Sequence, residues 1–177
     1  QRVRKMQTSH IDNSRIEKQI WTPFPEAVFK LNVDVAISSK DQMAGMGAVI
    51  RDSRGKVVAA RIKQAQQRGN VSLAEAEAVQ WGMQVAREAT LSSLIIESDC
   101  LEVVELVNNT KSSRTEIHWT ISEIQKQRKS FQNVKVKYVP RQCNACAHSL
   151  AKLALGRNTR TIWLQTMPVE VSNVMVL

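Results

Sequence analysis

The sequence has few cysteines, no long apolar run and no signal-peptide pattern. Its three cysteines are an odd number without the spacing of a disulfide scaffold, which indicates a reducing compartment, in the nucleus or the cytoplasm. Residues 1–20 are polar, and no stretch approaches the roughly 18 apolar residues that span a bilayer. We therefore expect an intracellular monomer without a membrane partner. The start at Gln1 is compatible with a fragment of a longer protein.

Acidic residues are also scarce. Against 25 Lys and Arg stand 16 Asp and Glu, which gives a formal net charge of +9. Such an excess favours a polyanionic partner, of which nucleic acid is the commonest. The 177 residues are enough for one domain with tails. We expect a tail or loose helix over residues 1–20, a folded domain over 21–165 and a C-terminal tail over 166–177.

Alternating apolar residues predict the first strand, over residues 29–37. Its apolar side chains fall on one face, and Asp34 lies on the other face. Residues 45–52 and 56–62, joined by a turn of sequence SRG, predict two further strands of an antiparallel meander. A continuous apolar run and a second alternating stretch predict two later strands, over 93–99 and 134–140.

Helical patterns separate and follow these strands. One helix is predicted to begin at about Ser72, because Ser72 can cap it and Glu75 completes a capping-box pattern. Further helices are predicted over residues 100–109, 116–129 and 144–155. The order of elements indicates the α/β or mixed α+β class, with a five-stranded mixed sheet and helices packed on it.

Three acidic residues occupy comparable places in these elements. Asp34 lies in the first strand, Glu75 in the first helical turn and Asp99 at the end of the fourth strand. They converge on one cleft if the first and fourth strands are neighbours. Helix phase selects Glu75 over Glu77, because Glu75 shares a stripe with residues that face the sheet, namely Val79, Gly82 and Met83.

Clustered carboxylates repel one another unless a cation neutralises them. Mg²⁺ suits a few carboxylates with waters and phosphate oxygens, and two such ions about 4 Å apart can catalyse phosphodiester hydrolysis. For any single acid, a solvated surface charge is the simpler interpretation. Three acids placed in this order favour a metal site.

The motifs KLNVDVA, GMGAVIRDSRGKVVAA, AEAEAVQWGM, IIESDC and VPRQCNACAHSLAK together resemble a type 1 ribonuclease H domain. The similarity covers about residues 21–165 and is greatest to the plant, retroelement-derived group of ribonuclease H-like proteins. It implies the ribonuclease H fold, in which three antiparallel strands precede two parallel ones. It also implies cleavage of the RNA strand of RNA/DNA hybrids with two Mg²⁺ ions, or with Mn²⁺.

The resemblance assigns roles to individual residues. Asp34, Glu75 and Asp99 match the first three catalytic, metal-binding carboxylates of the family. His148 stands where a fourth carboxylate is usual, and Asn144 matches the Asn that opens the last helix. The candidate contacts to substrate are Asn144 and Asn70.

Three departures from the family pattern leave a second function open. Val35 replaces a common glycine, the loop PRQC carries no histidine, and His148 replaces a carboxylate. An imidazole at position 148 is a softer ligand that favours Mn²⁺, or a proton shuttle, or simply a packed helix-edge residue. The alternative function is therefore a ribonuclease H-like nucleic-acid-binding or interaction module with weak or no activity.

Two further patterns favour structural interpretations. The spacing of Cys143, Cys146 and His148 is too tight on one helical turn to surround a zinc ion. Trp81 and Trp119 lie in predicted helices, where packing is a commoner role for tryptophan than stacking on bases.

Overall fold

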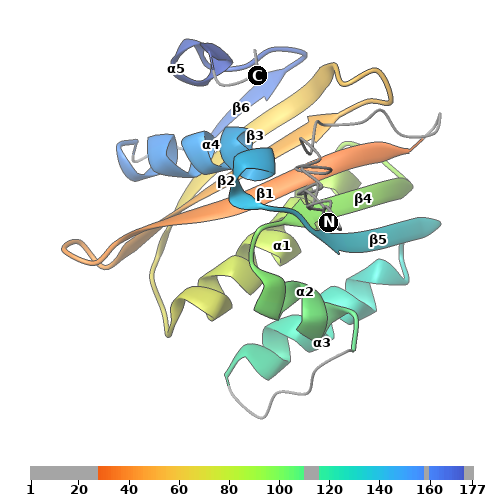
Figure 1. Cartoon of the computed structure of the whole chain (residues 1–177), viewed down its shortest axis with the longest axis horizontal. Coiled ribbons are helices and arrows are strands. Elements are labelled where there is room, and N and C mark those ends of the chain that lie inside the picture. The colour runs from red at the N-terminus through yellow and green to blue at the C-terminus, as the bar shows by residue number, and fades with distance from the viewer. Residues whose placement is uncertain (1–27, 110–115, 158–159, 174–177) are drawn as a thin grey trace, which may run out of the picture.

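The computed structural model describes residues 28–109, 116–157 and 160–173. The predicted tail over residues 1–20 lies outside these ranges. Six strands form a single sheet, shown in Figure 1. They are β1 (Phe29–Ser38), β2 (Met43–Arg51), β3 (Val57–Gln66), β4 (Ser93–Ser98), β5 (Asn133–Tyr138) and β6 (Thr161–Leu164).

The order of strands across the sheet is β5-β4-β1-β2-β3-β6. The first three strands are antiparallel neighbours, whereas β4 and β5 run parallel to β1. This confirms the predicted mixed sheet and places β1 beside β4. The predicted count of five strands was one too low, because β6 adds an antiparallel edge strand next to β3.

The helices lie on both faces of the sheet. They are α1 (Val71–Glu88), α2 (Leu101–Val107), α3 (Ile117–Arg128), the short 3₁₀ helix η1 (Arg141–Asn144), α4 (Ala145–Leu155) and α5 (Val169–Ser172). Helix α1 packs on β1 and β2 with α3 against it, and α4 crosses β1, β2 and β3. None of the helices in the described ranges combines the length and the apolar character that a membrane crossing needs.

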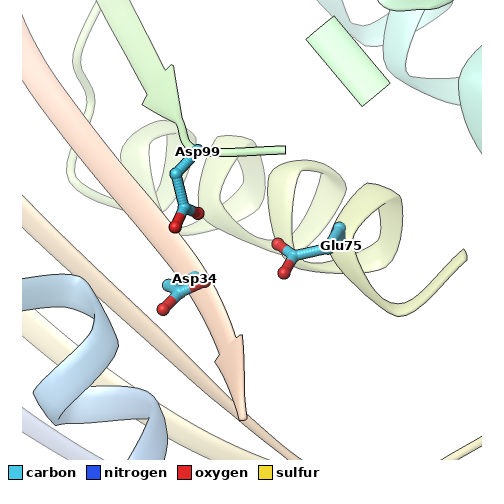
Figure 2. A group of neighbouring side chains, drawn as sticks. All are labelled: Asp34, Glu75 and Asp99. Atoms are coloured by element: carbon cyan, nitrogen blue, oxygen red, sulfur yellow. The ribbon is translucent and has the colours of Figure 1, made fainter. Parts of the chain in front are cut away.

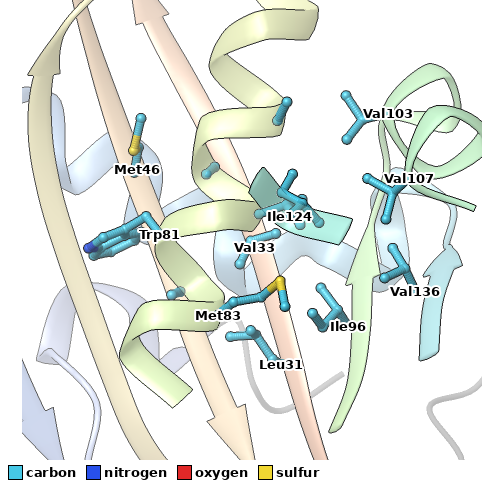
Figure 3. Close-up of a cluster of buried hydrophobic side chains, with 14 of the residues drawn as sticks. Leu31, Val33, Met46, Trp81, Met83, Ile96, Val103, Val107, Ile124 and Val136 are labelled. Carbon is cyan, nitrogen blue, oxygen red and sulfur yellow. The ribbon is translucent and has the colours of Figure 1, made fainter. Parts of the chain in front are cut away.

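The sheet separates two hydrophobic cores. The larger core, shown in Figure 3, joins α1, α2 and α3 to the sheet through residues such as Leu31, Val33 and Met83. The smaller core lies under α4 and includes Val49 and Leu150. Because β1 is covered on both faces, its polar alternate residues are buried as well, which its alternating sequence alone does not indicate.

The N-terminus of α1 differs from the prediction. Asn70, and not Ser72, caps the helix: its Oδ1 accepts a hydrogen bond from the backbone N–H of Leu73 at 2.9 Å. The Ser72 hydroxyl instead bonds the carboxylate of Glu102 in α2. Asn and Ser are about equally good caps, so the sequence pattern did not separate them.

The two helical tryptophans have different environments. Trp81 is 9% exposed and belongs to the larger core, as predicted. Trp119 is 78% exposed, so the prediction that it packs inside was wrong. The buried stripe of α3 consists instead of Ile117, Ile121 and Ile124, and Trp119 lies off that stripe.

Part of the predicted C-terminal tail is packed on the domain. Helix α5 contacts α4, and its Val171 is 1% exposed in the smaller core. The segment from β6 to α5 therefore covers the outer side of that core.

Candidate metal centre

Three carboxylates from separate elements meet where β4 ends, beside the middle of β1, and Figure 2 shows them pointing toward one another. Asp34 projects from the middle of β1, Glu75 from the second turn of α1, and Asp99 from the residue after β4. One oxygen of each lies within 4.8 Å of the others. The parallel pairing of β1 with β4 brings Asp34 and Asp99 together, although 65 residues separate them in sequence.

Burial and the repulsion of neighbouring charges make Asp34 and Glu75 hard to ionise. Asp34 is 1% exposed and Glu75 is 7% exposed. Burial, together with the nearby charge of Asp99, raises the pKa of Asp34 above its ordinary value. Burial first, and then the charges of Asp34 and Asp99, raise the pKa of Glu75 to about 8. Without a cation, the Glu75 carboxyl is therefore largely protonated at neutral pH.

The residues fit a hard divalent cation. The Oε2 atom of Glu75 is buried and has no hydrogen-bond partner among the described residues. A buried carboxylate oxygen without a donor is costly unless a cation binds it. Oxygen ligands from three carboxylates are the set that Mg²⁺ and Mn²⁺ use in proteins. Asp34, Glu75 and Asp99 would be the residues that hold such ions.

His148 lies beside this cluster on α4. Its Nδ1 is 2.7 Å from Oδ2 of Asp34, and its side chain is 29% exposed. It is not one of the three residues whose ligand atoms lie within 4.8 Å of one another. The contact with Asp34 favours the ionised carboxylate, but burial and Asp99 outweigh it in setting the pKa of Asp34.

The two predicted substrate contacts have different positions. Asn70 is exposed at the start of α1, where its oxygen caps the helix. Asn144 is 1% exposed, and its amide bonds the backbone carbonyl of Val33 and the carboxylate of Asp99. In this structure Asn144 thus faces the protein interior beside the acidic cluster.

Arg141 is a residue of the site that the sequence analysis did not single out. It lies in η1, its side chain is 71% exposed, and its Nε is 3.7 Å from Oδ2 of Asp99. Its charge also acts to lower the pKa of Glu75, against the larger effect of burial. The signal in the sequence was the lone cation of the PRQC loop, three residues before Asn144.

The sheet order, the helices on both faces and the acidic cluster together define a domain with the ribonuclease H fold. The chain belongs to the Reverse transcriptase-like family, whose model matches residues 32–154. This confirms the predicted resemblance to ribonuclease H domains. No curated protein matches the sequence.

Solved structures agree on the fold. RNase H1 of the halophilic archaeon Halobacterium salinarum is 19% identical with a TM-score of 0.69, over 73% of this chain and 98% of that one. The N-terminal RNase H domain of a Mycobacterium tuberculosis protein is 21% identical with a TM-score of 0.66, over 73% of this chain and 94% of that one. LC11-RNase H1, isolated from compost and solved with an RNA/DNA hybrid, is 18% identical with a TM-score of 0.66, over 72% of this chain and 96% of that one.

Proposed function

We propose that this chain is a metal-dependent endonuclease that hydrolyses the RNA strand of RNA/DNA hybrids. The observation that carries the proposal is the convergence of Asp34, Glu75 and Asp99, with ligand atoms within 4.8 Å of one another. The net charge of +9 and the likeness to LC11-RNase H1, which was solved with such a hybrid, support the choice of substrate.

Asp34, Glu75 and Asp99 would be the residues that hold two divalent ions. When bound, such ions supply a nucleophile at neutral pH and neutralise the charge that develops on the scissile phosphate. The raised pKa values of Asp34 and Glu75 imply that the ions displace protons as they bind.

His148 has two proposed roles that its geometry supports. Its Nδ1 contacts Asp34, which fixes the orientation of the ring. The other ring nitrogen, Nε2, is then the atom that can bind a metal ion or exchange a proton. An imidazole in this position can pass a proton to or from a neighbouring group. As a ligand in place of a carboxylate, it would favour Mn²⁺ over Mg²⁺.

Substrate recognition would rest on shape and charge. Proteins that read RNA-containing duplexes commonly contact 2′-hydroxyls and phosphates, which carry no base preference. Arg141, which lies beside Asp99, and Asn70, which precedes Glu75 at the start of α1, are exposed and are the residues that we assign to these contacts. We also propose, on the quoted motifs, a plant, retroelement-derived origin and a nuclear or cytoplasmic monomer.

A second candidate function is a nucleic-acid-binding module with weak or no turnover. The observation that favours it is His148 at the position of a fourth carboxylate, beside Asp34. Against it, the buried carboxylates of Asp34 and Glu75, with Asp99 beside them, cost stability unless a cation uses them.

The experiment is an incubation of the protein with a hybrid whose RNA strand is labelled, in Mg²⁺ and separately in Mn²⁺, beside Asp99→Asn and Asp34→Asn. RNA cleavage that disappears in both variants, while hybrid binding is kept, is the expected result. Binding without cleavage in either metal would replace the nuclease with the module. Cleavage that persists in both variants would contradict the assigned site.

A further inference from the structure

A chain of buried polar side chains runs from β4 through β1 to the acidic cluster. It begins with Lys30 and Glu97, whose Nζ and Oε1 atoms are 2.9 Å apart and whose side chains are 8% and 10% exposed. Asn32 lies opposite Glu97 in the β1–β4 register and is 2% exposed. It is two residues before Asp34, on the same face of β1. Burial of so many polar groups requires that each find a partner.

The partners fix which way the Asn32 amide points. Its Nδ2 donates to Oε2 of Glu97 at 2.9 Å and to Oδ1 of Asn144 at 3.2 Å. Its Oδ1 accepts from Nη1 of Arg51 at 3.1 Å. A carboxylate only accepts hydrogen bonds and a guanidinium only donates them. The reverse orientation would therefore place the Asn32 oxygen against the Glu97 carboxylate and the Asn32 NH₂ group against the Arg51 guanidinium.

The Asn144 amide is fixed in the same way. Its Oδ1 accepts from Asn32, and its Nδ2 donates to the backbone oxygen of Val33 at 2.9 Å and toward Oδ1 of Asp99 at 3.4 Å. A carbonyl oxygen can only accept, so the NH₂ group must lie on this side. The hydrogen bonds therefore have a single direction, from Asn32 to Asn144 and from Asn144 to Asp99.

We propose that Asn32 is a positioning residue of the metal centre. It holds the Asn144 amide with its NH₂ group toward Asp99, which orients that carboxylate for a cation. The inference rests on the proposed function, because it concerns the same acidic cluster. Residues that orient ligands from outside a metal site commonly change metal affinity by about 10- to 100-fold when they are altered.

The test is the double variant Asn32→Asp/Glu97→Gln. It leaves the net charge unchanged and restores a hydrogen bond between the two positions in the opposite direction, with the new amide donating to the new carboxylate. The oxygen of the new amide still accepts from Lys30. The side chain at position 32 then only accepts hydrogen bonds. Asn144 must therefore either turn its NH₂ group toward position 32 and its oxygen toward Asp99, or keep its oxygen against the new carboxylate without a hydrogen bond.

We expect Mn²⁺ affinity, measured from the EPR signal of free Mn²⁺, to fall about tenfold or more in the double variant. For the hybrid we expect a lower kcat with little change in KM. Val171→Ala, a truncation in the smaller core on α5 and away from this chain, is the matched control: it lowers the unfolding midpoint without changing Mn²⁺ affinity. Mn²⁺ affinity of the double variant within twofold of wild type would overturn the proposal.

A second readout separates this inference from the proposed function. In metal-free protein, the side-chain ¹⁵N–¹H₂ signals of Asn144, assigned by their loss in Asn144→Asp, should shift in the double variant. If they do not shift, the orientation argument is wrong. If wild type binds no Mn²⁺, the metal centre itself is wrong, and the signals still report whether Asn32 orients Asn144.

A milder pair of variants applies if the double variant does not fold. In Glu97→Gln, the cation of Lys30 takes the single amide oxygen, so the new NH₂ group faces Asn32 and forces the same reversal. In Lys30→Met/Glu97→Gln, that oxygen is released to accept from Asn32 again. At high ionic strength, which screens the difference in charge, we expect Mn²⁺ affinity to fall in the first variant and recover in the second. Equal affinities in the two would overturn the proposal.

Discussion

Gly47 lies directly opposite Asp34 in the β1–β2 ladder, and its missing side chain leaves room for α4. A Cβ atom at Gly47 would be 2.4 Å from the backbone oxygen of Ala147, closer than such atoms approach one another. The backbone of α4 therefore rests on β2 itself. This close packing brings His148, the next residue along α4, to within 2.7 Å of Asp34.

We expect Gly47→Ala to destabilise the protein and to separate His148 from Asp34. The added methyl group meets backbone atoms, which cannot turn away as a side chain can, so α4 must lift from the sheet. A loss of about 1–3 kcal/mol in the free energy of unfolding is expected, measured by urea titration in EDTA. Gly156→Ala is the control, because its Cβ would meet no atom closer than 3.7 Å. Equal stability of the two variants would contradict this account of the packing.

Sequence patterns predicted the elements that carry the site because those elements have strong periodic signals. The alternation in β1, the apolar run in β4 and the phase of α1 place Asp34, Asp99 and Glu75 without knowledge of the fold. The proximity of these acids depended on one further condition, that β1 and β4 are neighbours. No local pattern supplies that pairing, and the resemblance to ribonuclease H domains provided it.

Other features depend on tertiary contacts that leave little trace in the sequence. Strand β6 has four residues, too few for a periodic signal, and is stabilised by pairing with β3. Asn32 reads as one more polar residue of an alternating strand, yet its partners lie 65 and 112 residues away. The exposure of Trp119 follows from its position two residues from both Ile117 and Ile121, on the opposite face of α3 from the apolar stripe.

The raised pKa of Glu75 predicts how the stability of the metal-free protein depends on pH. Its folded-state pKa of about 8 lies above the ordinary value of 4.5, so folding is favoured while the group stays protonated. This contribution is complete below pH 4.5 and is lost as the pH rises through about 8. In EDTA, the free energy of unfolding should therefore fall by several kcal/mol, about 4 at most, between about pH 5 and pH 9.

Glu75→Gln tests this assignment. The variant should show a shallower fall over the same range, with the remaining slope due to Asp34, whose pKa is also raised. At about pH 9 the variant should be more stable than wild type in EDTA. Saturating Mn²⁺ should stabilise wild type more than the variant, because the ion binds only the folded state. Identical slopes for the two proteins would contradict the pKa assigned to Glu75.

The different environments of the two helical tryptophans predict different costs of truncation. Trp119→Ala should change the free energy of unfolding by less than about 0.5 kcal/mol, since the side chain is 78% exposed. Trp81→Ala should cost about 3–5 kcal/mol, because it leaves a cavity in the larger core. Chemical denaturation monitored by circular dichroism measures both. A large loss in Trp119→Ala would show that this side chain is covered in solution.

Replacing His148 by the carboxylate that the family usually carries should change the preferred metal. A carboxylate is a harder ligand than an imidazole, so His148→Asp should raise the ratio of the cleavage rate in Mg²⁺ to that in Mn²⁺ by about an order of magnitude. His148→Ala is the control, because it removes the imidazole without adding a ligand and should not raise the ratio. In EDTA, His148→Asp should also be less stable than His148→Ala, since a fourth acid then lies beside Asp34. An unchanged ratio in His148→Asp, with its stability in EDTA equal to that of His148→Ala, would place position 148 outside the reach of the metal.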